Sequence, residues 1–355
     1  MKAAVLREYG EPLRIEEREA PEPAPDGVVV AVEACGVCRS DWHAWQGHGE
    51  WADDRAPLGQ VLGHEPAGRV VAVGERVSTL REGDRVAVPF NLGDGSCPAC
   101  RSGHGNVCED GLALGFEPGA PGAFAERVHV PAAEYNAMPL PDGASARDVA
   151  ALGCRFMTAF HALTGRADVG AGEWVAVHGC GGVGLSAVAI ADALGARPVA
   201  VDVRDAALDL AREVGAEATV NAADRAGGEV PAAVRDATDG GAHVSVDALG
   251  VAETCRNSVR CLRRRGRHVQ VGLTTDAERG EVALPTDAIA RRELSVLGAR
   301  GMPPTRYDEL LSLLESGAVD PGALVTRELS LSAVPERLAA MTDYGTTGVE
   351  VVTSF

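Results

Sequence analysis

The sequence predicts an α/β protein in which a β-rich first part is followed by a doubly wound parallel sheet. Two observations support this prediction. The residue pattern changes near residue 170, and beyond it strands alternate with helices of about 10–15 residues. The chain has 355 residues, and at roughly 150 residues per domain this is enough for two domains. Its 46% hydrophobic and 24% charged residues are typical of a globular protein and argue against a disordered chain.

The first 150 residues favour short strands joined by loops. Residues 28–32 form a β-branched run after a proline-rich stretch at 21–27. Residues 69–73 and 85–88 are further expected strands, and glycine-containing turns such as 81–84 lie between them. This pattern is typical of a small antiparallel β domain.

Beyond residue 170 the alternation of strands and helices is typical of βαβ units and a parallel sheet. The expected elements are a strand at 174–178, a helix at 182–194, a strand at 199–203, a helix at 206–214, a strand at 244–248, a helix at 252–262 and a strand at 268–272. A helix at 306–316 and a last strand at 348–353 follow. Three arginines at 263–265 are expected at a solvated helix end before Gly266, where they would favour the helix dipole.

Charge and cysteine content limit the function classes. With 51 acidic and 33 basic residues the net charge is −18, so broad binding to nucleic acid or to an anionic membrane is not expected. The N-terminus has no apolar core of signal-peptide type, and no run approaches about 18 apolar residues. A cytoplasmic location is therefore expected, where cysteines stay reduced and serve metal binding or catalysis more often than disulfides.

A glycine-rich turn follows the strand at 174–178. It contains the pattern G-x-G-x-x-G in the residues Gly179, Gly181, Gly182, Val183 and Gly184. The first glycine permits the tight turn, the second lets the backbone approach a pyrophosphate, and the third allows close helix–strand packing. The helix N-terminus then offers unpaired N–H groups to the anion. The alternative is a glycine turn in an α/β sheet that binds no nucleotide.

Asp202 ends the next strand, 23 residues after Gly179. A carboxylate there would accept hydrogen bonds from the ribose hydroxyls of NAD and would repel the 2′-phosphate of NADP. Arg204 could favour that phosphate, so NADP remains possible beside the expected NAD.

Two sets of residues have metal-ligand chemistry. Asp94, Cys97, Cys100 and Cys108 lie in one glycine-rich loop, where three thiolates and a carboxylate can close a tetrahedral structural zinc site. The alternative is a loop that has lost its metal. Cys38, His64 and Cys154 offer a ligand set used in catalytic zinc sites, but spacing alone does not join them. The remaining cysteines are expected to be packing residues: Cys35, Cys180, Cys255 and Cys261.

In this combination and order, the motifs resemble those of the zinc-dependent alcohol dehydrogenases of the medium-chain dehydrogenase/reductase superfamily. They are Cys-Arg-Ser-Asp-x-His at 38–43, Gly-His-Glu at 63–65, Gly-Asp-Arg-Val at 83–86, the cysteine loop at 94–108, Leu-Gly-Cys at 152–154 and the glycine turn at 179–184. The resemblance implies a GroES-like catalytic domain at 1–155, an inserted Rossmann NAD-binding domain at 156–298, and a return to the catalytic domain at 299–355. It also implies a homodimer or homotetramer.

The resemblance assigns the metal centre. It implies that Cys38, His64 and Cys154 ligate a catalytic zinc, and that Glu65 beside them is an alternate ligand during ligand exchange. Asp41 would accept a hydrogen bond from the ring of His64 and fix its tautomer. The cysteine loop of the family normally begins with Cys, and here Asp94 stands at that position.

The resemblance also assigns substrate and cofactor contacts. Ser40 would bond the zinc-bound alcohol, and His43 would end a proton relay to solvent. Arg39 would contact the pyrophosphate, Thr158 would lie near the nicotinamide, and Phe90 would line the substrate pocket. The stretch 44–60 is expected to be a loop, with Trp42, Trp45 and Trp51 as loop anchors or pocket walls.

The expected function is a zinc-dependent oxidoreductase that transfers hydride between a small-molecule alcohol, or its aldehyde or ketone, and NAD(H). A zinc-bound alkoxide would form as Ser40 and His43 remove the proton. The first alternative is a reductase of C=C or C=N bonds on the same scaffold that uses NADPH. A second alternative is a nucleotide-sensing relative without catalytic turnover.

Overall fold

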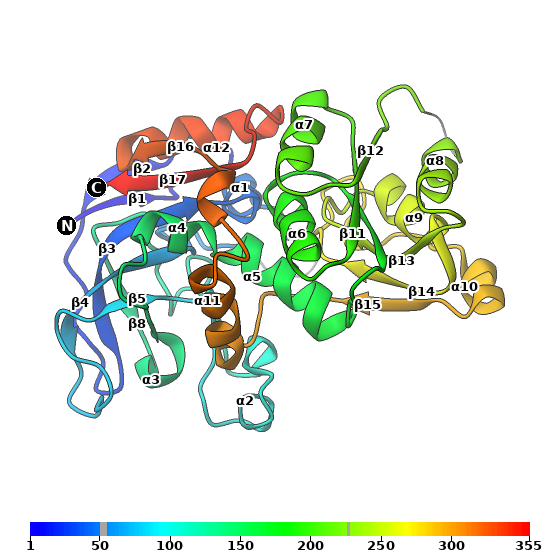
Figure 1. Ribbon diagram of the computed structural model, residues 1–355. Coiled ribbons are helices and arrows are strands. Elements are labelled where there is room, and N and C mark those ends of the chain that lie inside the picture. The colour runs from blue at the N-terminus through cyan, green and yellow to red at the C-terminus, as the bar shows by residue number, and fades with distance from the viewer. Residues whose placement is uncertain (50–54, 226–227) are drawn as a thin grey trace. The chain divides into compact units, whose positions relative to one another are not determined.

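The computed structural model describes residues 1–49, 55–225 and 228–355. The chain forms two compact units. Unit 1 consists of Met1–Met157 and Gly301–Phe355, and unit 2 consists of Thr158–Arg300. The chain therefore leaves unit 1, forms unit 2 and then returns to unit 1 (Figure 1).

Unit 1 is built on a seven-stranded sheet with the order β16-β17-β3-β4-β5-β9, in which β8 also pairs with β3. Its strands are β3 (Val28–Val37), β4 (Pro66–Val73), β5 (Arg85–Ala87), β8 (Arg127–Val130), β9 (Met138–Pro139), β16 (Val325–Ser330) and β17 (Val349–Ser354). The C-terminal strand β17 pairs antiparallel with β3, so the end of the chain joins a sheet that is otherwise formed mainly by residues before 140 (Figure 1). β3 is longer than the expected strand at 28–32 because small apolar residues such as Ala34 and Cys35 extend its buried pattern.

Smaller elements complete unit 1. The strands are β1 (Lys2–Val5), β2 (Arg14–Glu17), β6 (Asn91–Leu92) and β7 (Leu112–Ala113). The helices are α1 (Arg39–Gln46), α2 (Pro98–Arg101), α3 (Ala133–Asn136), α4 (Ala146–Ala151), α11 (Tyr307–Glu315) and α12 (Val334–Thr342), with short 3₁₀ turns η2 (Gly105–Val107), η4 (Pro304–Arg306), η5 (Pro321–Leu324) and η6 (Leu331–Ala333). Helix α5 (Cys154–Phe160) begins in unit 1 and continues into unit 2, where the π-helical turn η3 (His161–Arg166) follows.

The expected loop at 44–60 is wrong at its start. Residues 44–46 belong to α1, which ends at Gly47 in the left-handed conformation (φ 74°). Trp42 and Trp45 are spaced three residues apart and are both buried, so they give the helix one apolar face. Their indole N–H groups donate to Thr342 Oγ1 (3.0 Å) and to the Glu11 carbonyl (2.6 Å), so both side chains anchor the helix. Trp51 lies outside the described residues.

Unit 2 contains a six-stranded sheet with the order β12-β11-β10-β13-β14-β15, and every pairing in it is parallel. Its strands are β10 (Trp174–His178), β11 (Arg197–Asp202), β12 (Ala218–Asn221), β13 (Ala242–Asp247), β14 (Leu262–Gln270) and β15 (Ser295–Gly298). The strand order reverses between β10 and β13, and ligands of doubly wound sheets bind at such a switch point. The arginines at 263–265 lie in β14 and not at a helix end, because α9 stops at Arg260. They fall between Leu262 and Arg267, the residues that pair with β13, where the register of the two strands shifts.

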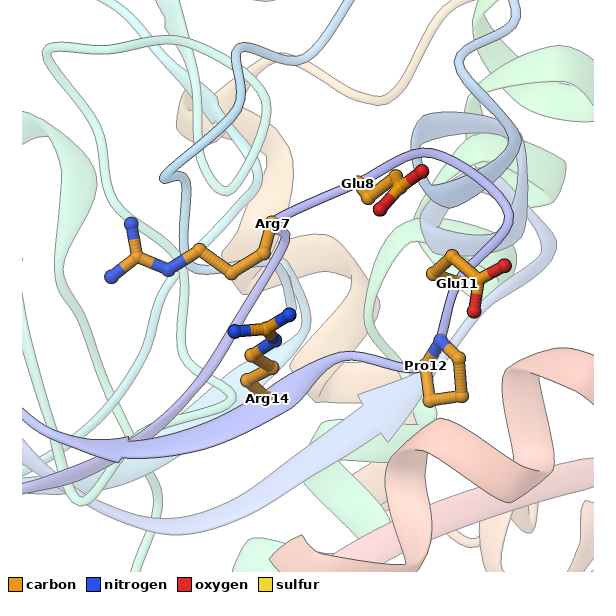
Figure 2. Close-up of a pocket in the computed structure, with 5 residues that line it drawn as sticks. All are labelled: Arg7, Glu8, Glu11, Pro12 and Arg14. Atoms are coloured by element: carbon orange, nitrogen blue, oxygen red, sulfur yellow. The ribbon is translucent and has the colours of Figure 1, made fainter.

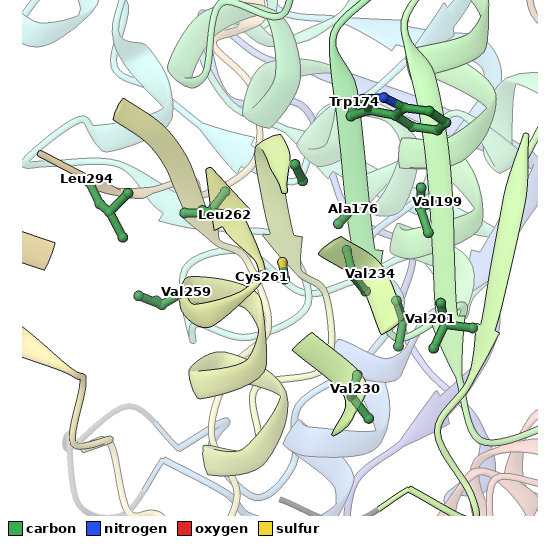
Figure 3. Packing of buried hydrophobic residues seen from close by; sticks show 12 residues of the cluster. Trp174, Ala176, Val199, Val201, Val230, Val234, Val259, Cys261, Leu262 and Leu294 are labelled. Atoms are coloured by element: carbon green, nitrogen blue, oxygen red, sulfur yellow. The ribbon is translucent and has the colours of Figure 1, made fainter. Parts of the chain in front are cut away.

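Helices cover the sheet of unit 2. They are α6 (Gly182–Ala193), α7 (Asp205–Glu213), α8 (Glu229–Ala237), α9 (Ala252–Arg260) and α10 (Thr286–Arg292). In one core cluster, strand residues such as Ala176 and Val199 pack with Val234 of α8 and Val259 of α9 (Figure 3). Among the helices of the described ranges, none is both long and apolar enough to cross a membrane.

Candidate active site

Four potential metal ligands from three distant segments of the chain meet inside unit 1. Cys38 caps the N-terminus of α1, His64 and Glu65 precede β4, and Cys154 begins α5. One ligand atom from each lies within 4.8 Å of the others, and all four residues are buried. Two soft sulfur atoms, an imidazole and a carboxylate are a donor set that suits zinc. The fold therefore joins the ligands that sequence spacing left separate.

Asp41 holds His64 in one orientation. Its Oδ1 accepts a hydrogen bond from His64 Nδ1 at 2.8 Å and another from the Gly63 backbone N–H at 3.1 Å. Because a carboxylate only accepts, Nδ1 carries the proton, and Nε2 is the ring nitrogen left for a metal. The buried Nε2 has no hydrogen-bond partner among the described residues. An unpartnered nitrogen facing two cysteines fits a metal ligand.

Cys38 is prepared as a thiolate by its local structure. Its backbone N–H donates to Asp41 Oδ2 at 2.9 Å, which sets the first turn of α1. A hydrogen bond from Cys154 and the neighbouring His64 hold the pKa of the Cys38 thiol well below its usual value, although burial opposes this. The same hydrogen bond, together with burial, raises the pKa of Cys154. Thiolate is the form that binds a metal, so a bound cation would displace the remaining proton.

Glu65 lies against a buried arginine that the sequence analysis missed. Arg155 Nε and Nη2 donate to Glu65 Oε1 (3.2 Å) and Oε2 (2.5 Å). Burial raises the pKa of Glu65 to about 7, while the positive charge of Arg155 works against that rise. An arginine beside a cysteine carries no sequence signal by itself, so only the fold could pair it with Glu65.

The two residues that the resemblance assigns to the alcohol, Ser40 and His43, lie in α1. Ser40 Oγ is 3.8 Å from Cys38 Sγ. The Nδ1 atoms of His43 and His48 are 2.9 Å apart, so one ring donates and the other accepts. Burial lowers the pKa of His43 to about 3, with further lowering by His48 and Arg39. The lowered pKa keeps the ring of His43 neutral near pH 7. His48, its hydrogen-bond partner, has no motif around it that would have selected it from the sequence.

Two aromatic rings border the His64 side of the cluster. The Phe90 ring centroid is 5.6 Å from that of His64, and the Phe116 centroid is 4.8 Å from it. Phe90 was assigned to the substrate pocket by resemblance, whereas Phe116 was not expected. Together they place apolar surface beside the cluster of potential metal ligands.

Arg39, assigned to the pyrophosphate by resemblance, has several contacts within unit 1. Its guanidinium lies over the Trp42 ring at 3.7 Å and over the Tyr344 ring at 4.6 Å. It also donates a hydrogen bond to the Met341 carbonyl. The side chain is thus held between α1 and the end of α12.

The second predicted cluster also forms. Ligand atoms of Asp94, Cys97, Cys100 and Cys108 lie within 4.8 Å of one another. Cys97 Sγ and Cys108 Sγ are 3.6 Å apart, and tetrahedral zinc with Zn–S bonds of about 2.3 Å needs sulfur atoms about 3.8 Å apart. Asp94 Oδ1 accepts from the Ser96 and Cys97 backbone N–H groups, which lower the pKa of Asp94 and keep it ionised. This ionised carboxylate can act as the fourth ligand.

The glycine turn of unit 2 has the geometry that the pattern requires. Gly179 has φ 89°, and a Cβ on Gly184 would lie 1.8 Å from the Gly179 carbonyl oxygen. A Cβ on Gly181, at the N-cap of α6, would meet nothing within 4 Å, so that side of the turn is open. Gly182 and Val183 begin α6.

Asp202 is held at this turn. Its Oδ2 accepts from the Cys180 backbone N–H at 2.7 Å, and its Oδ1 accepts from the Arg204 backbone N–H at 2.9 Å. Arg204 Nε lies 3.6 Å from Oδ1. In α5, the buried Thr158 hydroxyl has no hydrogen-bond partner within the part of the chain that the structure describes.

A surface hollow of about 190 Å³ lies beside the β1–β2 hairpin. Its lining residues are Arg7, Glu8, Glu11, Pro12 and Arg14 (Figure 2). Their charged groups point in different directions, and Arg7 is already paired with Glu16 through bonds of 2.8 and 2.6 Å. None of the predicted site residues lines it, so the hollow is not the candidate site.

Two family models match the chain. The model described as alcohol dehydrogenase GroES-like domain matches residues 24–142, and the one described as zinc-binding dehydrogenase matches residues 182–316. The chain belongs to the zinc-type alcohol dehydrogenases of the medium-chain dehydrogenase/reductase superfamily. The predicted fold class, a GroES-like domain with a Rossmann domain, is confirmed.

Curated relatives and a solved structure agree with this assignment. The enzyme is 34% identical to an alcohol dehydrogenase of Geobacillus stearothermophilus over 326 residues, 90% of each chain. It is 32% identical to an NAD-dependent alcohol dehydrogenase of Sulfurisphaera tokodaii over 359 residues, 99% of each chain. The alcohol dehydrogenase TADH from Thermus sp. ATN1 superposes with a TM-score of 0.90 at 29% identity, with full coverage of both chains. The predicted zinc-dependent oxidoreduction of alcohols and carbonyl compounds with NAD(P) is confirmed.

Proposed function

We propose that Cys38, His64 and Cys154 hold the catalytic zinc of this alcohol dehydrogenase, and that Ser40 and His43 move the proton of the alcohol. One observation carries the proposal: the buried cluster of ligand atoms includes a His64 Nε2 without a partner among the described residues. When bound, zinc supplies a Lewis acid that lowers the pKa of an alcohol and polarises a carbonyl.

The residues around the metal have distinct tasks in this proposal. Asp41 fixes the tautomer of His64, and Phe90 and Phe116 provide apolar surface for the carbon side of the substrate. Ser40 accepts the alcohol proton, since its hydroxyl lies next to Cys38. His43 receives that proton in turn and shares it with His48 through their Nδ1 atoms.

Ser40→Ala is expected to lower kcat for alcohol oxidation about a hundredfold, because general acid–base help is worth about that much. The loss should shrink as the pH rises, since hydroxide in solution then takes the proton. Stopped-flow measurement of NADH formation at pH values from about 6 to about 10 checks both the lower rate and its dependence on pH. Ser40→Thr keeps the hydroxyl and should restore most of the rate. Equal rates for the alanine variant and the wild type would contradict the role of Ser40.

We further propose that the nucleotide binds the glycine turn of Gly179–Gly184 with a preference for NAD, in which Asp202 recognises the ribose. The open side of Gly181 and the carboxylate held beside the turn support this. Thr158, whose buried hydroxyl lacks a described partner, would face the nicotinamide. Arg39 is proposed to contact the pyrophosphate, as the family resemblance implies.

Asp94, Cys97, Cys100 and Cys108 are proposed to hold a second, structural zinc. We expect the wild-type enzyme to contain two zinc ions per chain, and Asp94→Ala to contain one. Loss of this metal should lower the midpoint of thermal unfolding by several degrees, because a structural zinc contributes to folding directly. Mass spectrometry measures the zinc content, and calorimetry measures the midpoint of thermal unfolding.

Asp110→Ala is the matched control. It alters an exposed carboxylate of the same loop and should keep two zinc ions. Two zinc ions in the Asp94 variant would rule out Asp94 as a ligand.

We also propose that the enzyme forms a homodimer or homotetramer and acts in the cytoplasm. Its family resemblance supports the assembly, and the nine free cysteines are compatible with a reducing compartment. Light scattering after size exclusion measures the assembly.

A further inference from the structure

The pair of Glu65 and Arg155 is a strong contact between buried charges in unit 1. Three N–H groups of Arg155 reach the carboxylate: Nε (3.2 Å) and the backbone N–H (3.3 Å) bind Oε1, and Nη2 (2.5 Å) binds Oε2. Arg155 Nη1 also donates to the Val37 carbonyl at 2.9 Å, which ties the guanidinium to β3. Glu65 is 1% exposed and Arg155 is 4% exposed. Neither charged side chain therefore reaches solvent.

Two glycines leave the space that this pair occupies. A Cβ on Gly36 would lie 2.1 Å from Glu65 Oε2 and 2.6 Å from Arg155 Nη2. A Cβ on Gly153 would lie 2.5 Å from the Glu65 Cβ. The backbone therefore closes around the ion pair on two sides and fixes its place.

The same carboxylate also lies within reach of the metal position. A Glu65 oxygen is within 4.8 Å of the ligand atoms of Cys38, His64 and Cys154. A catalytic zinc keeps one position open, whereas four protein ligands close it. Glu65 can act as that fourth ligand, yet both of its oxygens are engaged by Arg155. The guanidinium and the cation compete for one carboxylate.

We propose that Arg155 keeps the fourth coordination position of the metal open by holding Glu65. This inference rests on the ligand set proposed above. Arg155 is a positioning residue: it acts through Glu65 and does not touch the substrate. Without the guanidinium, a carboxylate that cannot reach water has the metal cation as its nearest compensating charge, and it would bind there.

The test uses cobalt in place of zinc, because the visible absorption of Co²⁺ reports its ligands. Cobalt-loaded wild type should change its spectrum when imidazole is added, since imidazole enters the open position. Arg155→Met should not respond. We expect this variant to release metal to a chelator about tenfold more slowly, because ligand-shell changes alter metal affinity about 10–100-fold. Its turnover should fall about 10–100-fold. The loop site of Asp94 has four protein ligands and contributes the same background throughout.

Two further variants make the result decisive. Glu65→Gln combined with Arg155→Met removes both charges, so it should fold and respond to imidazole as wild type does. Arg337→Met breaks a matched buried pair, in which Arg337 binds Glu350 through bonds of 2.8 and 2.6 Å. It should keep the wild-type imidazole response and metal release, whatever stability it loses.

Each outcome decides between the alternatives. If cobalt-loaded Arg155→Met responds to imidazole like wild type, or releases its metal faster, Arg155 does not restrain Glu65. If the cobalt spectrum of Arg337→Met also fails to respond to imidazole, general destabilisation would explain the behaviour of Arg155→Met. An unchanged cobalt spectrum in Cys38→Ala would instead overturn the proposed ligand set, which keeps that failure distinct from this one.

Discussion

Cys38→Ala is expected to lose at least about a thousandfold of its alcohol turnover, because the Lewis acid contributes several kcal/mol and each 1.36 kcal/mol is about tenfold in rate. His64→Ala should lose turnover to a similar extent, since it removes another proposed ligand of the same cluster. Binding of NADH should stay within about twofold of wild type, because the glycine turn belongs to unit 2 and the metal cluster to unit 1. Initial rates, NADH fluorescence titration and zinc content measure the three quantities.

Cys35→Ala is the matched control. Cys35 is a buried cysteine on β3, three residues before Cys38, and donates weakly to the Gly36 carbonyl. Its replacement removes a comparable volume without touching the proposed ligands, so zinc content and turnover should remain. Near-normal turnover in Cys38→Ala protein that lacks the catalytic zinc would remove the metal from the mechanism.

Asp202→Ala is expected to change the preference between NAD and NADP about a thousandfold in favour of NADP. A hydrogen bond to a charged group is worth about 1.5–3 kcal/mol, and the variant can no longer form such bonds to the ribose hydroxyls of NAD. The variant also no longer repels the 2′-phosphate of NADP, and the guanidinium of Arg204 can then bind that phosphate. The ratio of kcat/KM for the two cofactors is the measurement.

Asp202 also holds the glycine turn through the Cys180 N–H, so the alanine variant could loosen the turn. Asp202→Asn keeps an acceptor and the side-chain size while it removes the charge, and it should shift the preference in the same direction. Asp205→Ala removes an exposed carboxylate three residues away and should leave the ratio unchanged. An unaltered ratio in both Asp202 variants would show that another residue selects the cofactor.

Local patterns allowed much of the fold to be predicted. The expected strand at 174–178 coincides with β10, and the glycine turn and α6 follow it as the pattern indicated. The cysteine loop also forms a cluster as spacing suggested, because its members are close in sequence. Predictions failed where a tertiary contact outweighed the local pattern. Residues 44–46 became helical because Trp42 and Trp45 pack inward. The arginines at 263–265 became part of a strand because the residues on either side of them, Leu262 and Arg267, pair with β13.

The sequence by itself determined the features whose causes are local: the glycine positions of the turn, the acid that follows it, and four potential ligands within one loop. Only the tertiary structure decided which distant residues meet. It brought Cys154 to Cys38 and His64, and it set Arg155 on Glu65. The physical reason is that an unpaired buried charge costs free energy, so a buried charged group is stable only next to a compensating group. Tertiary packing decides which residue lies there, whatever its distance along the sequence. The roles of these residues as metal ligands and positioning groups stay predictions for the experiments above.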